Sequence, residues 1–511
     1  MKNTIIKKNS YYDSVTLMSL SGKISGLEGV LEAVVSMATD MNKELIKNIG
    51  LSNEQSNLAS SNDLLIGISA IDEESYHKAL AVVEELLTVR NNNETTGKQA
   101  QPKNINQALK DTDANLAIIS VPGIYAAREA RIALENNLHV MIFSDNVSLE
   151  DERKLKELGR EKGLLVMGPD CGTASINNVG LCFSNKVRKG NIGIIGASGT
   201  GLQEVMVQIH RLGGGISQAI GTGGRDLKEE IGGIMMIESL KALNEDQNTD
   251  LIVLVSKPPA KSVEMKILNE IKNIQKNVVV CFLDGTKEHE EIPNATFVYG
   301  LLDAAKVAVN NAGINKPVNT IQSTNCINID DLKKSLNSQQ KYFRGLYCGG
   351  TLCAEALSIL RTDFINIKSN VSKVESEKLS NYDNYKGNVL LDLGEDEFTS
   401  GKPHPMIEPS LRLDRLISEA NDPEVGVILL DFELGYGSHE DPVGVTLHAI
   451  RESNRIANAN GRKLIFVAYI CGTDFDKQNY ETQRMMLENE GVIVVDSNTD
   501  AANLVIDLLS E

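Results

Sequence analysis

Small residues and hydroxyl groups fill a turn at residues 196–201, GASGTG. The turn follows an apolar stretch at 191–195 and precedes residues 202–209, whose apolar side chains recur at helical spacing, so a buried strand is predicted to lead directly into a helix. Its glycines let a ligand approach the backbone, and Ser198 can cap the helix. The free amides and dipole of a helix N-terminus favour a phosphate or a carboxylate. A tight turn without a ligand explains the same residues, because the lysine of a P-loop is missing.

Other turns of small residues also follow predicted strands. Gly349-Gly350-Thr351 begins a predicted helix in the last third of the chain, and earlier turns lie at 168–173 (GPDCGT), 221–226 (GTGGRD) and 256–259 (SKPP). In open α/β sheets, ligands bind at the carboxyl ends of the strands. The three earlier turns are therefore expected to gather beside GASGTG.

Composition limits the classes of function. A length of 511 residues suggests roughly three or four domains, and 41% hydrophobic with 23% charged residues is typical of a globular protein. A net charge of −18 and the absence of tryptophan argue against partners such as nucleic acid or anionic membranes. Neither a membrane-spanning run nor a signal-peptide core is evident, so a cytoplasmic location is expected. Seven cysteines without a CxxC pair fit reduced thiols rather than disulfides or a zinc site.

Alternating strand and helix patterns predict an α/β protein. We expect two doubly wound parallel-sheet domains of flavodoxin-like or Rossmann-like type, a partial Rossmann-like unit and a small N-terminal α+β module. The expected boundaries are 1–90 for a ferredoxin-like α+β module, 105–187 for the Rossmann-like unit, 188–312 for the first α/β domain and 340–511 for the second. Within the N-terminal module we expect strands at 14–20, 35–39 and 64–70 and helices at 27–34, 42–49 and 73–89.

These motifs carry a resemblance to a known family. GPDCGT, NIGIIGASGTG and IGTGGRD resemble segments of the α subunit of succinyl-CoA synthetase, and CGGTLCAEA with the final α/β unit resembles the ligase domain of its β subunit. The order of these parts, the opening IIKKNSYYDSV and the run DLGEDEFTSGKPHPMIEP resemble the FdrA family over essentially the whole chain. In the synthetases, the helix N-termini matching Ser198-Gly199-Thr200 and Gly349-Gly350-Thr351 face each other across a phosphoryl group. The resemblance implies one anion site built by both halves.

Several departures separate the chain from the synthetases. The Gly-His-Ala-Gly segment of the phosphorylated histidine is replaced by IPNATFVYGLLDAA at 292–305, and His289 upstream is interpreted as a surface residue. The glutamate that steadies that histidine corresponds to Lys257, a cation that suits a bound phosphate. The ATP-grasp domain is missing, and 116–173 resembles only the second half of a CoA-binding domain, without its Gly-rich loop. We therefore do not expect nucleotide-driven thioester synthesis by this chain alone.

The resemblance to FdrA implies a component of a multi-subunit oxamate carbamoyltransferase, which interconverts oxalurate and phosphate with oxamate and carbamoyl phosphate in anaerobic purine and allantoin catabolism. Carbamoyl transfer needs positioned groups rather than a metal or a nucleotide, so no cofactor is expected. The implied partners are small-molecule substrates and co-encoded subunits, and a homo-oligomer stays open. One alternative is a succinyl-CoA ligase-like acyl-CoA synthetase that takes its nucleotide and CoA elements from partner subunits, with Cys171 or His404 replacing the phosphohistidine. Another is a non-catalytic scaffold that kept an old anion site.

Candidate catalytic residues are Lys257, His404 and Asp170. His404 is held between two prolines and could be a general base, bind the oxamate carboxylate or be structural. Asp170-Cys171 could act in acid–base or covalent chemistry, although a cysteine beside glycine in such a turn is more often a packing residue. Phosphate or substrate binding is assigned to Ser198, Gly199, Thr200, Gly201, Gly349, Gly350, Thr351, Gly223, Gly224, Arg225, Cys171, Gly172 and Thr173.

A polar segment near the end of the chain and two further cysteines are also considered as site residues. Residues 433–441 could line the same cleft or form a solvated loop. His439 and its acidic neighbours lack a metal-binding spacing, so no structural metal is expected. Cys348 and Cys353 are interpreted as packing residues.

Overall fold

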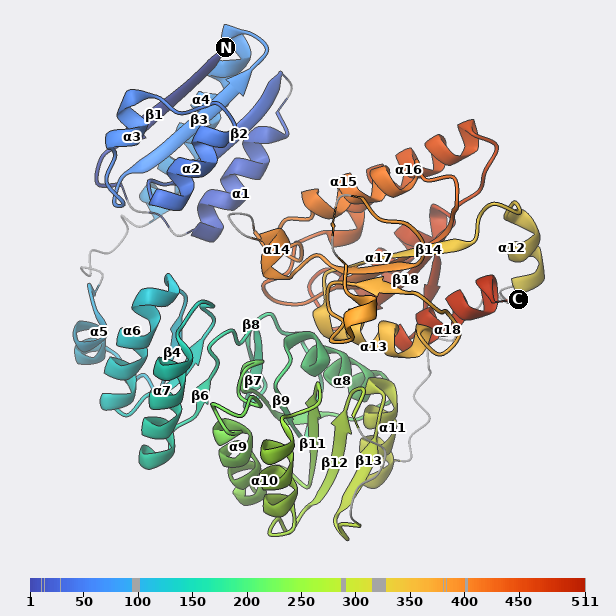
Figure 1. Ribbon diagram of the computed structural model, residues 1–511. Helices are drawn as coiled ribbons and strands as arrows, with labels where there is room; N and C mark the ends of the chain where they lie inside the picture. The colour runs from blue at the N-terminus through green and yellow to red at the C-terminus, as the bar shows by residue number, and fades with distance from the viewer. Residues whose placement is uncertain are drawn as a thin grey trace. The chain divides into compact units, whose positions relative to one another are not determined.

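The computed structural model describes residues 1–10, 12, 14–27, 29–93, 102–285, 291–314, 328–379, 381–382, 384–399 and 403–510. Contacts divide the chain into two units: Met1–Pro102 with Glu395–Glu408 form unit 1, and Lys103–Gly394 with Pro409–Glu511 form unit 2 (Figure 1). Parallel sheets in unit 2 and a small antiparallel module at the N-terminus confirm the predicted α/β class. No helix within the described ranges combines the length and apolar character that crossing a membrane requires.

Unit 1 is built on a three-stranded antiparallel sheet of order β1-β3-β2. Its elements are β1 (Lys2–Lys7), α1 (Ser14–Ser25), β2 (Val30–Met37), α2 (Asp40–Asn48), α3 (Glu54–Leu58), β3 (Leu64–Ala70) and α4 (Glu73–Asn93), with α14 (Asp396–Thr399) from the later segment.

Two sequence predictions for this module are wrong, and one strand was not predicted. Residues 14–20 form the helix α1 instead of a strand, most of 27–34 belongs to the strand β2 instead of a helix, and β1 was not expected. Leu17, Leu20 and Ile24 are buried at spacings of three and four residues, which is the period of a helix lying on a sheet. The apolar period, rather than the β-branched residues nearby, was the informative signal.

The first part of unit 2 is a small parallel sheet of order β4-β5-β6. Its elements are α5 (Ile105–Asp111), β4 (Leu116–Ile119), α6 (Gly123–Glu135), β5 (His139–Ile142), α7 (Leu149–Lys162) and β6 (Val166–Met167).

A seven-stranded sheet follows, in the order β13-β12-β11-β9-β10-β7-β8. Its first five strands are parallel, whereas β7 and β8 run antiparallel to their neighbours. The elements are β7 (Thr173–Ile176), β8 (Val179–Cys182), β9 (Lys189–Gly196), α8 (Gly199–Arg211), β10 (Ile216–Gly221), α9 (Ile234–Glu245), β11 (Leu251–Ser256), α10 (Lys261–Ile271), β12 (Asn277–Phe282), β13 (Ala295–Val298) and α11 (Leu301–Asn311).

The last sheet has six parallel strands in the order β15-β16-β14-β17-β18-β19. Its strands are β14 (Tyr342–Tyr347), β15 (Lys368–Ser369), β16 (Val389–Asp392), β17 (Val425–Glu433), β18 (Ile465–Cys471) and β19 (Ile493–Val495). Its helices are α12 (Ile329–Ser335), α13 (Gly350–Leu360), α15 (Ser410–Glu419), α16 (Pro442–Ala459), α17 (Tyr480–Asn489) and α18 (Asn498–Leu509), with a short 3-10 turn at Glu375–Glu377.

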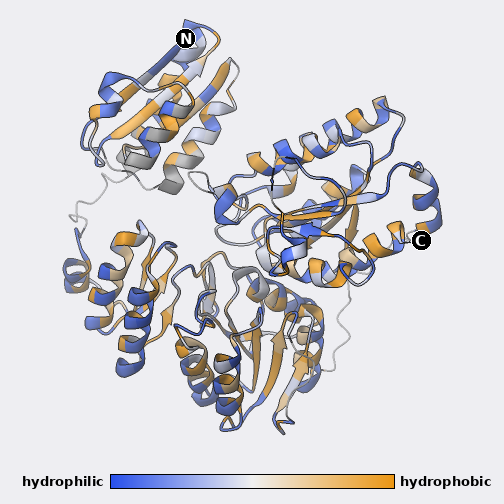
Figure 2. Cartoon of the chain, in the orientation of Figure 1, coloured by the Kyte–Doolittle hydropathy of each residue, from blue (hydrophilic) through white to orange (hydrophobic). Residues whose placement is uncertain are grey.

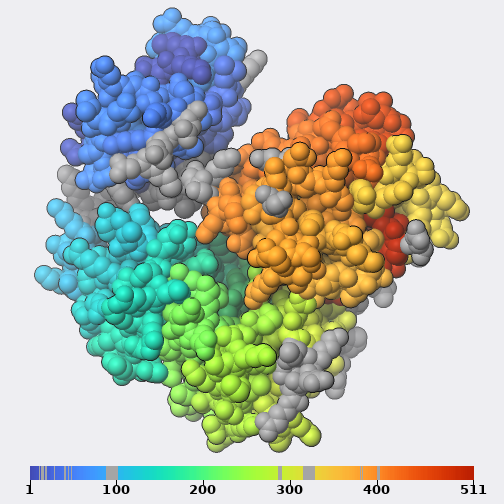
Figure 3. Space-filling model, viewed as in Figure 1, coloured from blue at the N-terminus to red at the C-terminus, as the bar shows by residue number. Residues whose placement is uncertain are grey.

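One hydrophobic core joins the two larger sheets of unit 2. It contains α8 and α11 from the first and α13, α18 and β18 from the second. The strands of both sheets are strongly apolar (Figure 2), as expected for parallel strands covered on both faces. In the space-filling view, the green atoms of the first domain and the orange atoms of the second are in contact (Figure 3).

Helix α8 is also fixed to the second domain by polar contacts. The Arg211 guanidinium at its C-terminal end donates to the carbonyl oxygens of Ile470 at 2.8 Å, Gly472 at 2.8 and 3.1 Å, and Asp496 at 2.9 Å. Just before β9, the Asn185 amide donates to the carbonyl of Leu434 at 2.9 Å, beyond the end of β17. The domain interface is therefore both apolar and hydrogen bonded.

Replacing Arg211 by alanine removes these donors from carbonyls at the domain interface. We expect Arg211→Ala to lower the free energy of unfolding of unit 2 by about 3 kcal/mol, because acceptors left without partners are costly. Arg451→Ala is the control, since the Arg451 side chain is 60% exposed and paired with Glu490 at the surface, and should cost less than about 1 kcal/mol. Urea unfolding of the full chain, followed by near-ultraviolet circular dichroism, measures both. Equal effects of the two substitutions would contradict this account of the interface.

Candidate functional site

The turn at 196–201 lies at the carboxyl ends of three parallel strands. β9 ends at Gly196, whose carbonyl accepts the Thr222 amide beyond β10 at 2.8 Å, and the Ala197 amide donates to the carbonyl of Val255 in β11 at 3.2 Å. Ser198 is the N-cap of α8, and its hydroxyl accepts the Gly201 amide at 3.0 Å. The sequence thus folds locally as its pattern predicts, with a strand leading into a capped helix.

The structure brings the second glycine turn directly against the first. Gly349 is the N-cap residue of α13, and the hydroxyls of Ser198 and Thr351 are hydrogen bonded to each other. The Thr351 amide donates to the Thr200 hydroxyl at 3.2 Å. A Cβ added at Gly201 would lie only 3.1 Å from the Thr351 methyl group. Two helix N-termini from different domains therefore meet through their hydroxyl-bearing residues.

Thr173 supplies another hydroxyl to the α8 turn. Its side chain, at the start of β7, is 1% exposed, and its Oγ1 has no hydrogen-bond partner in the described structure. A Cβ added at Gly199, the first residue of α8, would lie 3.3 Å from that oxygen. A buried hydroxyl without a partner costs free energy unless a ligand completes it.

Asp170 and Cys171 precede Thr173 in the GPDCGT turn and behave differently from each other. Asp170 is exposed and has a φ of 54°, and its amide donates to the Ser144 carbonyl at 3.0 Å. Burial raises the pKa of the Cys171 thiol to about 12. A neutral thiol is a poor nucleophile, so packing is the better interpretation of Cys171.

Arg225 is turned toward the Rossmann-like part of unit 2. Its guanidinium pairs with the buried Glu152 at 2.9 Å and donates to the Val147 carbonyl at 2.8 Å. Next to it, the buried Lys156 ammonium binds Glu152 at 2.8 Å and Asp226 at 3.0 Å. Arg225 is therefore part of a buried ion network. The backbone of the GTGGRD turn is closer to the α8 turn, since a Cβ added at Gly224 would lie 3.8 Å from the Ala197 carbonyl oxygen.

Lys257 follows β11 directly, at the same edge of the sheet as the GASGTG turn. Burial raises the pKa of the Cys353 thiol in the first turns of α13 well above its ordinary value, and the Lys257 ammonium acts against that shift. The Lys257 charge is thus within electrostatic reach of Cys353 in α13.

Neither of the two histidines considered from the sequence belongs to the described part of unit 2. His404 belongs to unit 1, where its Nδ1 accepts the Met406 amide at 3.2 Å, so it is not among the residues that unit 2 assembles. His289 lies outside the described residues.

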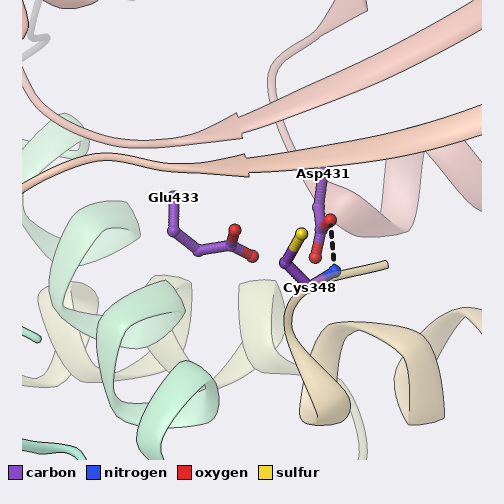
Figure 4. A group of neighbouring side chains, drawn as sticks. All are labelled: Cys348, Asp431 and Glu433. Carbon is purple, nitrogen blue, oxygen red and sulfur yellow. Dashed lines mark hydrogen bonds between the residues drawn. The ribbon is translucent and has the colours of Figure 1, made fainter. Parts of the chain in front are cut away.

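A buried acidic group behind α13 was missed by sequence reasoning. Cys348 lies just before the α13 N-cap, and Asp431 and Glu433 end strand β17 (Figure 4). Asp431 accepts the amides of Cys348 and Gly349, each at 2.8 Å. Burial, together with the neighbouring Asp431 charge, raises the pKa of Glu433 well above its ordinary value. Two acids within the otherwise apolar run VGVILLDFE were the available sequence signal.

Within 433–441, Glu433 lies beside the start of α13, whereas Tyr436, Gly437, Glu440 and Asp441 are exposed, as in a solvated loop. Tyr436 forms an isolated β-bridge with Ser184, the His439 imidazole accepts the Asp441 amide at 3.0 Å, and Asp441 caps α16.

Comparison with known families identifies the parts of the chain. Residues 346–507 match the model described as CoA-ligase, residues 187–284 match the CoA binding domain, and residues 1–104 match the AllF heavy metal-associated domain. The CoA binding match falls almost entirely on the first α/β domain, expected at 188–312, and not on 116–173, the segment that resembles half of a CoA-binding domain. Residues 1–104 contain no cysteine, and His77 forms an exposed pair with Glu73, so this module offers no thiolate site for a heavy metal.

Individual proteins similar to this chain include alpha subunits of succinate–CoA ligases. Subunit alpha 2 of an ADP-forming succinate–CoA ligase from Archaeoglobus fulgidus is 27% identical over 165 residues, which cover 32% of this chain and 56% of that protein. The alpha subunit from Staphylococcus epidermidis strain RP62A is 28% identical over 185 residues, which cover 35% of this chain and 60% of that protein. A structure of a dinucleotide-forming acetyl-coenzyme A synthetase from Ca. Korarchaeum cryptofilum, in complex with phosphate and ADP, aligns with a TM-score of 0.30 and 13% identity over 78% of this chain and 83% of that one.

A full-length relative comes from Escherichia coli K12. Its uncharacterized protein YahF is 47% identical over 506 residues, which cover 99% of this chain and 98% of YahF. The chain therefore belongs to the YahF family and carries succinyl-CoA ligase-like CoA-binding and CoA-ligase domains together with an AllF-type N-terminal domain.

Proposed function

We propose that this chain is a subunit of a carbamoyl or acyl transferase that holds phosphate, or the phosphate group of an acyl phosphate, at the N-terminus of α8. The observation that carries the proposal is the convergence of hydroxyls there: Ser198, Thr200 and Thr351 meet, and the unpartnered Thr173 hydroxyl points toward Gly199. Hydroxyls, helix amides and the nearby Lys257 are the donors that a phosphate requires.

The reaction that we assign is phosphate-dependent cleavage of oxalurate. A phosphate oxygen attacks the carbamoyl carbon, the bond from that carbon to the oxamate nitrogen breaks, and a proton moves to this nitrogen, which gives carbamoyl phosphate and oxamate. Such a transfer depends on alignment and on fixed donors around the developing charge. The resemblance to FdrA and the AllF match of residues 1–104 support this choice of substrate.

Acid–CoA ligation with partner subunits is the second candidate. The CoA binding match at 187–284 and the likeness to succinate–CoA ligase alpha subunits favour it. Incubation of the chain, with and without co-encoded subunits, with oxamate and carbamoyl phosphate or with ATP, CoA and small acids separates the two. We expect oxalurate in the first mixture. We also expect radiolabelled ATP to leave no acid-labile, base-stable phosphate on histidine, and such a label would favour the ligase.

Thr173 offers a test that distinguishes a ligand-binding hydroxyl from a structural one. Thr173→Val keeps the shape of the side chain and removes a hydroxyl that has no partner among the described residues, so the free energy of unfolding should stay equal or rise. The affinity for inorganic phosphate should fall about tenfold, because a hydrogen bond to a charged group is worth about 1.5 kcal/mol or more. Calorimetric titration with phosphate and urea unfolding measure the two quantities.

Thr446→Val is the matched control for Thr173→Val. Thr446 is equally buried, and its hydroxyl donates to the Pro442 carbonyl at 2.8 Å within α16. This variant should lose about 1 kcal/mol of stability and keep the affinity for phosphate. The proposal fails if Thr173→Val binds phosphate as tightly as the unchanged chain.

Lys257 tests the charge requirement of the site. Lys257→Ala should reduce phosphate-dependent oxalurate cleavage by the reconstituted complex about ten- to a hundredfold, since a charge-assisted contact contributes roughly 1.5–3 kcal/mol. Lys257→Glu should reduce it further, because it places a negative charge against the anion. Rates at subsaturating phosphate, with folding checked separately, give the answer. Unchanged rates in both variants would rule out Lys257 as an anion ligand.

A further inference from the structure

The group formed by Cys348, Asp431 and Glu433 has the composition of a metal site. One potential ligand atom from each residue lies within 4.8 Å of the other two, and the side chains are 2%, 0% and 3% exposed, respectively. Asp431 and Glu433 are two positions apart on β17, so they project from the same face of the strand. Cys348 approaches them from the turn between β14 and α13 (Figure 4).

The Glu433 carboxyl group independently indicates that a cation binds here. Its Oε1 is buried and has no hydrogen-bond partner among the described residues. A Cβ added at Gly349 would lie 2.8 Å from this oxygen and 3.1 Å from Asp431 Oδ2. Both carboxylates are therefore aimed at the space beside the α13 N-cap. A buried, unpaired carboxylate oxygen is costly in a protein interior unless something binds it.

Arg412 is a cation in direct contact with this group, and its guanidinium lies 3.3 Å from Asp431 Oδ1. That ion pair engages Asp431 and leaves Glu433 Oε1 without a partner among the described residues.

We propose that Cys348 Sγ, Asp431 and Glu433 bind one divalent transition-metal ion of the Zn²⁺ type. A thiolate combined with carboxylates suits Zn²⁺ and Co²⁺ better than Mg²⁺ or Ca²⁺, which prefer oxygen ligands alone. Three protein ligands are the usual number in zinc sites that keep one position open for water or substrate. The metal site stands on its own geometry and does not depend on the proposed phosphate chemistry.

The proposed metal site lies beside the N-termini of α8 and α13, where a cation would act on nearby charges. Gly349 lies between the acidic group and Thr200 of α8, since its Cβ position is 3.1 Å from the Thr200 methyl carbon. An ion held there would neutralise the carboxylates beside the helix N-termini and could polarise an oxygen of an anion at the α8 turn. This task, unlike the metal site itself, rests on the proposed function.

Titration of the metal-free full chain with Co²⁺ and Zn²⁺ tests the proposal. We expect one Co²⁺ per chain with a near-ultraviolet thiolate-to-metal charge-transfer band, displacement by Zn²⁺, and a higher thermal midpoint with Zn²⁺. Cys348→Ser should abolish the charge-transfer band, and Glu433→Gln should weaken binding at least about a hundredfold, because loss of a ligand exceeds the 10- to 100-fold cost of losing a supporting residue.

Cys353→Ala is the matched control. This thiol is on the same helix and fully buried, but it packs in the hydrophobic core and not in the acidic group. The variant should keep the stoichiometry, the band and the affinity. Near-ultraviolet circular dichroism confirms that each variant is folded, and Glu433→Asp, which retains a carboxylate, should recover part of the affinity. The proposal is overturned if the unchanged chain binds neither ion, or if Cys348→Ser and Glu433→Gln bind like the unchanged chain.

Discussion

The meeting of two helix N-termini is the constraint on which unit 2 depends. α8 and α13 both present the positive ends of their dipoles at this point, and Ser198, Thr200 and Thr351 join them by hydrogen bonds. Two positive helix ends repel each other unless negative charge lies nearby. Behind α13, Asp431 accepts two backbone amides and supplies that charge. At α8 no carboxylate occupies the first turn, and an anionic ligand would complete the balance.

Contacts along α8 hold this geometry. Its C-terminal end is fixed by Arg211 to carbonyls beyond β18 and β19, and in its middle the Glu204 carboxylate accepts a hydrogen bond from the Tyr469 hydroxyl. The helix is a component of the first domain by sequence but is packed against the second along its length. A rigid helix clamped at both ends can hold donors in fixed positions, which is what electrostatic stabilisation of a transferred group requires.

The sequence predicted those features that depend on neighbouring residues. GASGTG was recognised as a strand-to-helix turn because glycine, a capping serine and helical periodicity all lie within a few positions. The prediction of a strand at 14–20 is wrong, because Leu17, Leu20 and Ile24 recur at helical spacing and are buried on one face of α1.

Features made by tertiary contacts were beyond local patterns. Arg225 was expected to donate hydrogen bonds to the anion. In the structure its guanidinium forms an ion pair with the buried Glu152 instead. The group of Cys348, Asp431 and Glu433 joins residues far apart in sequence, so no spacing motif could reveal it. Thr173 was included as part of a turn, whereas its unpartnered hydroxyl and its direction toward Gly199 follow only from packing.

Direct location of a bound anion is the sharpest test of the account. Crystals of the full chain soaked in arsenate, a phosphate analogue with a usable anomalous signal, would show where the anion binds. The account predicts an anomalous peak at the N-terminus of α8, within hydrogen-bond distance of Thr173 Oγ1 and the first amides of the helix. An empty α8 turn at saturating arsenate, or a peak only elsewhere on the chain, would contradict it.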